Sequence, residues 1–267
     1  MRGAVVLVLV LAACSGPVER AQGDYPTVVS LNPCADAILA EIVAPGQLLA
    51  VSHYSHDPAA SSMLPQRAAQ FAGTGGTAEE VLALAPDVVV ADVFIQPATR
   101  RALEQAGIRV VALGIASSLE ASLEQVELLG AATGNEVRAA KLSGEIATSW
   151  QTHRWNGEPA TAILWQQGGI VAGEGSLAHD LMQQSGFASM SAARGLGQGA
   201  YLPLEEVLAD PPQVVITAGD ERAFSHPVMA EADGTAHHTL ASSLLYCGGP
   251  TIPRALARLA EIRRQVP

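Results

Sequence analysis

Aromatic and imidazole side chains stand at the ends of several apolar runs of the sequence, where we expect strands to end. Tyr54 and Phe94 follow two such runs in the first half of the chain, and Trp165 ends one in the second half. Aromatic faces provide broad apolar contact at a small entropic cost, so the three could form the wall of a site for a large planar ligand. His53 and His56 beside Tyr54 could ligate iron or cobalt, or hydrogen-bond a chelator.

Polar groups near the same strand ends are further candidates for ligand contacts. Ligands of open parallel sheets bind beyond the carboxyl ends of the strands, where the following loops supply the contacts. Few cationic residues lie near these strand ends, and this scarcity argues against a strongly anionic ligand. Arg222 is the best placed of them. The other candidates are Asn32, Pro33, Gln166, Glu174, Asp220 and Tyr246.

Two cysteines, Cys34 and Cys247, lie near these loops and allow three kinds of chemistry. They could remain separate thiols, form a disulfide across the two halves of the chain, or bind a soft metal as a thiolate pair. Export from the cytoplasm would permit oxidation. The metal site has the least support, because the cysteines lack CxxC spacing and a nearby histidine.

The N-terminus has the pattern of an export signal. Arg2 precedes an apolar run at residues 4–13, which is shorter than the roughly 20 residues needed to span a bilayer. The run ends at LAACS, which resembles the bacterial lipoprotein box, in which the cysteine, here Cys14, is lipidated. We expect a lipoprotein signal peptide at residues 1–13, a tether at residues 14–26, and a lipid-anchored protein at the periplasmic face of the cell envelope. An ordinary signal peptide with an unmodified cysteine is the alternative.

The chain is acidic and long enough to bury a large core. It has 267 residues, with 26 Asp and Glu against 15 Lys and Arg, for a formal net charge of −11. This charge makes nucleic acid an unsuitable partner. The length that remains after the signal and the tether suits two lobes of about 100 residues each.

An internal repeat organises the chain. The sequence EEVLALAPDVVV at residues 79–90 returns as EEVLADPPQVVI at residues 205–216, with eight of twelve positions identical. Each copy predicts a short helix that opens with two acidic residues, then a proline, then a β-branched run. Such a run is typical of a strand buried on both faces of a parallel sheet. The two halves therefore share one plan.

The other patterns continue this alternation of strands and helices, which predicts an α/β fold of two Rossmann-like lobes with parallel central sheets. A polar stretch around His237 and His238 is expected to be a surface loop. We expect strands at residues 27–31, 48–52, 109–113, 160–165 and 169–172, and helices at residues 35–43, 98–106, 177–185 and 251–264.

A proline-free stretch separates the halves and predicts a helical connection. We expect a first lobe at residues 27–116, the connection at residues 117–158 and a second lobe at residues 159–267. Ser117 and Glu120 have capping-box spacing at the start of the connection. A single long helix from Glu136 to about residue 155 would then join the lobes as a rigid strut of about 30 Å.

The chain resembles the class III periplasmic binding proteins, which capture ferric siderophores, haem and vitamin B12 for ABC importers. The resemblance covers nearly the whole mature chain and rests on VVSLNP at residues 28–33, VSHYSHDP at residues 51–58, the repeated EEVL segments and the single interlobe helix. It implies a monomeric binding protein, not an enzyme, that delivers a metal chelate to a membrane permease and its ATPase. The transported ligand would carry the iron or cobalt, and the protein would hold no cofactor or metal of its own.

The resemblance also implies a role for Glu79 and Glu205. In the family, one surface glutamate of each lobe docks onto arginines of the permease, and these two residues open the repeated segments. The alternative role is that of a favourable charge at a helix N-terminus.

Two other functions stay open on the residues alone. A secreted metal-dependent hydrolase could use His53, His56, Asp57 and Asp220, although its third ligand is not identified. A transport protein for free zinc or manganese would need histidines and carboxylates that converge from both lobes. The sequence contains no GxSxG, HExxH or Walker A pattern.

Overall fold

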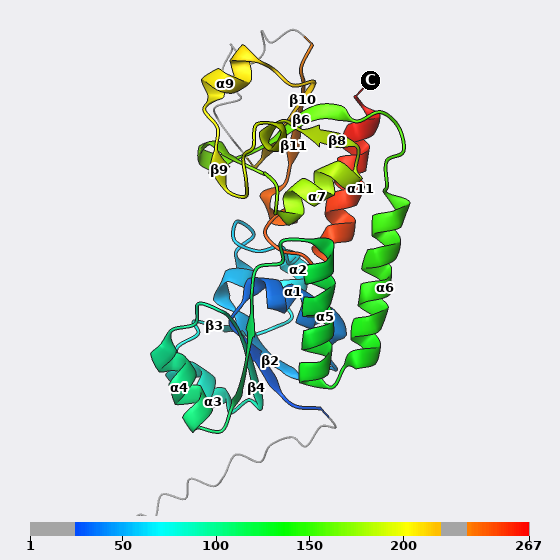
Figure 1. Ribbon diagram of the computed structural model, residues 1–267. Coiled ribbons are helices and arrows are strands. Elements are labelled where there is room, and N and C mark those ends of the chain that lie inside the picture. The colour runs from blue at the N-terminus through cyan, green and yellow to red at the C-terminus, as the bar shows by residue number, and fades with distance from the viewer. Residues whose placement is uncertain (1–24, 220–233, 267) are drawn as a thin grey trace, which may run out of the picture.

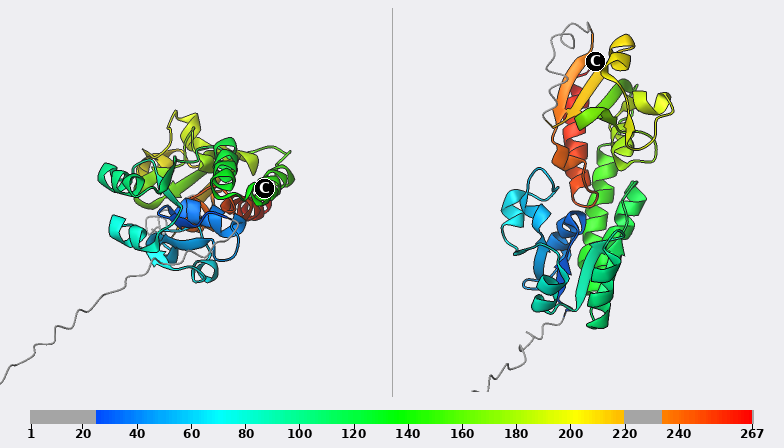
Figure 2. Two further views of the ribbon diagram at one scale, coloured as in Figure 1. Left: turned by 90° about the horizontal axis from the view of Figure 1, so that it is seen from below. Right: turned by 90° about the vertical axis from the view of Figure 1, so that its left-hand side faces the viewer.

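The computed structural model describes residues 25–219 and 234–266. Two sheets with flanking helices are stacked end to end into an elongated molecule of two lobes (Figure 1, Figure 2). The predicted signal peptide, Cys14, nearly all of the tether, Asp220 and Arg222 lie outside the described residues.

The first lobe contains a five-stranded sheet in which all paired strands run parallel, in the order β3-β2-β1-β4-β5. Every residue of β1 is buried, as are the first four of β4, as expected for β-branched strands that are covered on both faces. The strands are β1 (Val28–Ser30), β2 (Leu48–Ser52), β3 (Gly73–Thr74), β4 (Val88–Asp92) and β5 (Arg109–Leu113).

Four helices and a 3-10 turn connect these strands. Three of the helices start with a proline, whose φ is already helical and whose missing N–H is one of those that the first turn leaves unpaired. The elements are α1 (Pro33–Ile42), α2 (Pro65–Ala68), α3 (Ala78–Leu84), α4 (Pro97–Gln105) and η1 (His53–His56).

The repeated segments form the same unit in both lobes. Each opens a short helix, α3 or α9 (Leu204–Ala209), and each ends in a buried strand, β4 or β10 (Val214–Ala218). β4 pairs in parallel with β1, and β10 pairs in parallel with β6 (Ala160–Gln166), so each repeat strand lies beside the first strand of its lobe. The predicted common plan of the two halves is confirmed.

The second sheet is mixed rather than wholly parallel. β11, β10, β6 and β8 run parallel, whereas β7 is antiparallel to both β6 and β9. The chain reverses between β6 and β7 at Gly168 and Gly169, whose φ angles of 75° and 82° are left-handed. The remaining elements are β7 (Ile170–Val171), β8 (Phe187–Ser189), β9 (Ala200–Tyr201), β11 (Ala236–Leu240), α7 (Leu177–Gln184), α8 (Met190–Ala193), η2 (Gln167–Gly169) and η4 (Ser242–Leu244).

The prediction of a surface loop around His237 and His238 is wrong. Both residues belong to β11, which pairs with β10 over five residue pairs at the edge of the second sheet. An edge strand tolerates polar residues because one of its sides stays open to solvent.

Three long helices lie along one side of the molecule: α5 (Leu119–Thr133), α6 (Glu136–Thr152) and α11 (Thr251–Arg264) (Figure 1). α6 packs against α1 and α5 of the first lobe and against α11 of the second. Its 17 residues span about 25 Å at 1.5 Å per residue, somewhat less than the sequence predicts. Ser118, not Ser117, caps α5, because its side chain accepts the hydrogen bond from the N–H of Ala121.

A buried hydrogen-bond network fastens the turn between α5 and α6 to the first lobe. Asn135 Nδ2 donates to Gln47 Oε1 at 2.8 Å, and Gln47 Nε2 donates to the carbonyl oxygens of Thr133 at 2.7 Å and Pro26 at 2.9 Å. Gln47 and Asn135 are both buried, where broken hydrogen bonds are costly. The first-lobe end of α6 is therefore held in place.

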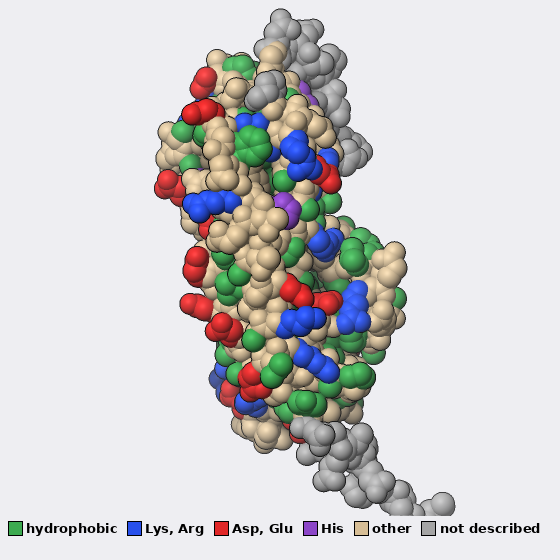
Figure 3. Space-filling view, turned by 90° about the vertical axis from the view of Figure 1, so that its right-hand side faces the viewer, with side chains coloured by type: hydrophobic (Ala, Val, Ile, Leu, Met, Phe, Trp, Pro, Cys, Tyr) green, Lys and Arg blue, Asp and Glu red, His purple; other side chains and the backbone are tan. Residues whose placement is uncertain are grey.

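The face on the α6 side carries acidic and basic side chains among scattered hydrophobic ones (Figure 3). None of the described helices is long and apolar enough to cross a membrane.

Candidate ligand-binding site

A cavity of about 130 Å³ lies where the carboxyl ends of β1, β4 and β5 meet the segment that leads into α11. Parallel strands bring their carboxyl ends to one edge of the sheet, so segments that are distant in the sequence converge there. The second lobe closes the cavity with three consecutive residues. The lining residues are Asn32, Cys34, Asp92, Phe94, Leu113, Gly114, Ile115, Ala116, Gln125, Tyr246, Cys247 and Gly248.

Large apolar side chains stand exposed around this cavity. Phe94 and Ile115 of the first lobe are 75% and 69% exposed, and Tyr246 of the second lobe is 44% exposed. The turn after β4 fixes Phe94, because its backbone N–H donates to Asp92 Oδ1 at 2.6 Å. Exposed apolar side chains that gather in one place mark a surface that another apolar group covers. The cavity thus offers apolar contacts from both lobes.

Asp92 is the one charged residue in the described lining of the cavity. A carboxylate repels anionic groups and attracts cationic ones. The described lining therefore favours a neutral or weakly charged ligand.

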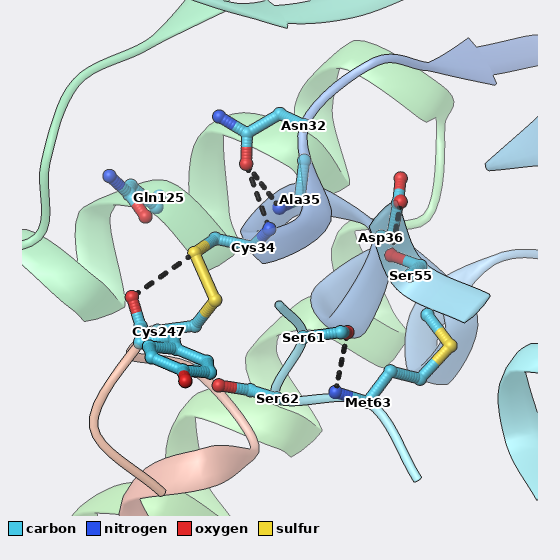
Figure 4. The surroundings of a disulfide bond; sticks show 12 residues. Asn32, Cys34, Ala35, Asp36, Ser55, Ser61, Ser62, Met63, Gln125 and Cys247 are labelled. Carbon is cyan, nitrogen blue, oxygen red and sulfur yellow. Dashed lines mark hydrogen bonds between the residues drawn. A yellow bond between two sulfur atoms is a disulfide. The ribbon is translucent and has the colours of Figure 1, made fainter. Parts of the chain in front are cut away.

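Cys34 and Cys247 form a disulfide in the cavity wall (Figure 4). Their Cα atoms lie 5.1 Å apart, although 213 positions separate them in the sequence. Cys34 lies in the first turn of α1 and Cys247 lies between η4 and α11, so the bond joins the two lobes. Of the three kinds of chemistry that the sequence allows, the structure contains the disulfide.

Asn32 and Pro33 shape the start of α1 beside the disulfide. Asn32 Oδ1 accepts hydrogen bonds from the backbone N–H groups of Cys34 at 2.8 Å and Ala35 at 3.1 Å (Figure 4). This capping interaction occupies the Asn32 oxygen, so its Nδ2 donors remain for a ligand. Pro33 is the first residue of α1, and its role there is to direct the backbone.

The turn η1 carries His53, Tyr54 and His56, all exposed, at the carboxyl end of β2. His53 Nδ1 lies 3.3 Å from the carbonyl oxygen of Thr74, and the rings of His53 and Tyr54 have centroids 4.0 Å apart. These residues share the sheet edge with the cavity but do not line it. Within the described residues, no group of three or more His, Cys, Asp or Glu side chains is placed to hold a metal ion.

Asp36 is a buried carboxyl group beneath η1 that the sequence did not single out, since one acid in a helical apolar run is common. It is 0% exposed, and its Oδ2 accepts a hydrogen bond from the N–H of Ser52 at 2.9 Å. The same oxygen accepts from Ser55 Oγ at 2.6 Å (Figure 4). Burial raises the pKa of Asp36 to about 7, against the opposing effect of hydrogen bonds from Ser30, Ser55 and Ser52. Asp36 therefore connects α1 to η1 and titrates near neutral pH.

The family model described as periplasmic binding protein matches residues 28–237. The chain belongs to the periplasmic binding protein family. Binding proteins of this family and their structural neighbours transport substrates rather than catalyse reactions, so the chain is not an enzyme, and the hydrolase alternative is set aside. The family also indicates a location outside the cytoplasm and a partnership with an ABC permease.

Solved structures of binding proteins share the fold of this chain. HutB of Vibrio cholerae, a periplasmic haem-binding protein, aligns with a TM-score of 0.73 and 18% identity over 89% of this chain and 98% of its own. BtuF of Vibrio cholerae, a periplasmic vitamin B12 binding protein, aligns with a TM-score of 0.65 and 20% identity over 90% of this chain and 97% of the BtuF chain. RhuT from Roseiflexus sp. RS-1, a periplasmic haem-binding protein, aligns with a TM-score of 0.68 and 20% identity over 90% of this chain and 97% of the RhuT chain. No curated protein matches the sequence.

The predicted resemblance to the class III periplasmic binding proteins and the two-lobed α/β fold are thus confirmed. The ligand of this binding protein does not follow from the likeness alone, because the identities are low and the fold accommodates different ligands.

Glu79 and Glu205 of the binding protein are exposed in the first turns of α3 and α9. The glutamate that follows each is engaged within its own lobe: Glu80 accepts hydrogen bonds from the preceding loop, and Glu206 pairs with Arg194 at 3.5 Å. In the part of the chain that the structure describes, Glu79 and Glu205 make no hydrogen bond or ion pair. Their carboxylates are thus available to a partner.

Trp165 does not form part of the cavity wall, which corrects the sequence prediction. Its side chain is 3% exposed and packs in the core of the second lobe with Val171 and Leu202. The reason is that both faces of β6 are covered, and Trp165 shares with Ile163 the face that packs into the second-lobe core. Gln166 is partly buried at the end of β6 and Glu174 is exposed in the next loop, and neither lines the cavity.

Ile115 and Gln125 are among the cavity residues that the sequence prediction missed. Ile115 follows β5 just as Phe94 follows β4, so the strand-end rule applied to every strand would have found it. Gln125 comes from α5, and its Nε2 donates to the carbonyl oxygen of Gly114 at 2.7 Å. No local pattern marks this side chain, because its position depends on how α5 packs.

A larger cavity, of about 330 Å³, lies between the C-terminal end of α6 and α7. It is near the amino ends of β6 and β8, where Trp155 N–H donates to the carbonyl oxygen of Gln184 at 2.9 Å. Ligands of parallel sheets bind at the opposite, carboxyl edge. The smaller cavity between the lobes is therefore the candidate for the ligand site.

Replacing Asp36 with asparagine should remove a pH dependence of stability. The carboxyl has a pKa of about 4 in an unfolded chain and about 7 in the folded protein. Between these values the folded state binds a proton that the unfolded state lacks, so the free energy of unfolding falls as pH rises, by up to about 1.4 kcal/mol per pH unit. Urea unfolding at pH 5 and pH 8 measures this slope.

The Asp36→Asn protein should be more stable than the wild type at pH 8 and show a flatter profile. Asp57→Asn is the control, because it removes an exposed carboxylate next to the same turn. Equal slopes for the wild type and Asp36→Asn would contradict a raised pKa at this site.

Proposed function

We propose that the protein is the substrate-binding lipoprotein of an ABC importer and that it captures a metal chelate between its lobes. The observation that carries the proposal is the group of exposed apolar side chains, Phe94, Ile115 and Tyr246, at the carboxyl edge of the first sheet. Two lobes contribute to this group, and the chain belongs to a family of transport proteins. The iron or cobalt belongs to the cargo rather than to the protein.

The size of the cavity supports a ligand that lies across its mouth. A volume of about 130 Å³ is below the 300–1,000 Å³ typical of pockets that enclose a drug-sized ligand. A tetrapyrrole or siderophore would therefore place one edge in the cavity and cover Phe94, Ile115 and Tyr246 with the rest of its surface. Fully burying such side chains stabilises a complex by roughly 1.5–3 kcal/mol each.

The charge of the described lining supports a corrinoid or a weakly charged siderophore. Haem carries two carboxylates and a catecholate siderophore carries several negative charges, which would call for cations. The described lining contains Asp92 and no basic residue. The neighbouring folds, a vitamin B12 binding protein and two haem-binding proteins, are compatible with either ligand class.

The lipid anchor at Cys14 completes the proposal. The apolar run and LAACS sequence support lipidation of Cys14 after cleavage of residues 1–13. A diacylated cysteine would keep the protein at the membrane, where the permease and its ATPase act.

We further propose that Glu79 and Glu205 dock the protein onto the permease. Both are exposed, both occupy the same register of the repeat, and neither has a partner among the described residues, unlike Glu80 and Glu206. One carboxylate in each lobe can engage two cationic patches at the same time, which favours correct orientation.

Phe94→Ala should weaken ligand binding about tenfold or more, because the change removes an aromatic contact at the centre of the proposed site. Isothermal titration calorimetry with cyanocobalamin, haemin, a neutral ferric trihydroxamate and an anionic ferric catecholate measures the affinity of each. The uncharged chelates should bind more tightly than the anionic ones. Val137→Ala is the control, since Val137 is an exposed apolar residue on α6, away from the cavity. Absence of binding to all four chelates would refute the proposed ligand class.

Glu79→Ala combined with Glu205→Ala should abolish uptake and leave chelate affinity unchanged, because the two carboxylates lie outside the cavity. Uptake of a labelled chelate by whole cells measures transport, and immunoblotting checks protein levels. The control replaces Glu127 and Glu136, two exposed acids of α5 and α6, and makes the same change in charge. Normal uptake by the Glu79 and Glu205 double variant at normal protein level would overturn the docking role.

A further inference from the structure

A set of contacts beside the cavity fastens the chain of the second lobe to the first lobe, and we call it the interlobe seam. It consists of residues 246–254 of the second lobe against α1, α5 and residues 59–62 of the first. The Cys34–Cys247 disulfide is its covalent member. Next to it, the Tyr246 hydroxyl donates to the carbonyl oxygen of Ala59 at 2.8 Å.

Three more contacts extend the seam. The N–H of Gly249 donates to Ser122 Oγ of α5 at 2.6 Å, and Arg254 Nη1 donates to the carbonyl oxygen of Ser62 at 2.8 Å. Gly249 also lies so close to Ile38 that a side chain at this position would clash with it. The seam therefore brings the start of α11 into direct contact with the first lobe.

The seam and α6 are two separate attachments between the lobes. α6 lies along one side of the molecule (Figure 1). The hydrogen bond between the buried Gln47 and Asn135 holds its first-lobe end. The hydrogen bonds of the seam can each be exchanged for hydrogen bonds to water. The disulfide cannot be exchanged in this way, so among the described contacts of the seam it is the one that sets a fixed limit on the separation of the lobes.

The disulfide is open to attack from the cavity. Both cysteines line it, and Cys34 is partly exposed whereas Cys247 is 6% exposed. A small thiolate can therefore approach Cys34 Sγ from the solvent side. Cys34 also lies in the first turn of the ten-residue helix α1, whose dipole favours a negative charge such as the thiolate that reduction leaves there.

We propose that the Cys34–Cys247 disulfide is a redox site that sets the aperture of the ligand cleft. In the oxidised form the covalent bond holds the two lobes together at the cavity. A dithiol reduces the bond, and the segment that carries Tyr246 then separates from α1 and widens the cleft. The inference concerns the position of the lobes and does not depend on which ligand binds.

The reaction is a two-electron thiol–disulfide exchange. One thiolate of the dithiol attacks Cys34 Sγ, the bond between the two cysteine sulfurs breaks, and Cys247 leaves as a thiolate that takes up a proton. The second thiol of the reductant then attacks the mixed disulfide and releases Cys34. Two thiols form in the protein, and the reductant becomes a cyclic disulfide.

Pulsed electron–electron resonance between the lobes tests the proposal. Spin labels are attached through thioether bonds to Arg101→Cys in α4 and Ala209→Cys in α9, in the full chain with Cys14→Ser. Both parent residues are exposed. Dithiothreitol should shift the distribution of distances between the labels to longer values and broaden it. Reoxidation should restore the original distribution. Alkylation with mass spectrometry confirms that two thiols have formed under native conditions.

The matched control adds Cys34→Ser and Cys247→Ser to the same labelled protein. It should show the longer distances without any reductant, and dithiothreitol should not change them. Circular dichroism follows the fold of each sample. The proposal is overturned if the distances between the labels stay the same after reduction, or if dithiothreitol lengthens them equally in the serine variant. It is also overturned if the disulfide resists reduction in the folded protein, or if loss of the disulfide unfolds the chain.

Discussion

The parallel arrangement of the first sheet is the constraint on which the site depends. Because all five strands point the same way, the residues after β1, β4 and β5 meet at one edge, although they are separated by tens of positions in the sequence. The second lobe approaches this same edge with Tyr246 and its neighbours. Apolar side chains from distant segments thus collect at the junction of the lobes, and a ligand there can contact both.

Three sets of contacts hold this junction together. α6 contacts helices of both lobes, the Gln47–Asn135 network holds its first-lobe end, and the interlobe seam fastens the lobes beside the cavity. A site that is already in its binding geometry loses less conformational entropy when the ligand arrives. Solved binding proteins share this architecture at 18–20% identity, so the side chains at the sheet edge, rather than the fold, must distinguish one ligand from another.

The sequence predicts the features that depend on local pattern and on repetition. The duplicated helix–strand unit, β2, β5 and α11 are found where periodicity and prolines place them. Trp165 was misplaced because the apolar run does not show that both faces of β6 are covered, including the face that Trp165 shares with Ile163. The disulfide could not be decided, because it depends on the approach of two segments 213 positions apart. The pKa of Asp36 likewise depends on burial that only the assembled fold creates.

The most direct test of the account is a crystal structure of the protein with the chelate that it binds most tightly. The account predicts that the ligand lies between the lobes, in van der Waals contact with Phe94 and Ile115 on one side and Tyr246 on the other. A ligand found in the outer cavity between α6 and α7, or bound to His53 and His56 without contact to the second lobe, would contradict it.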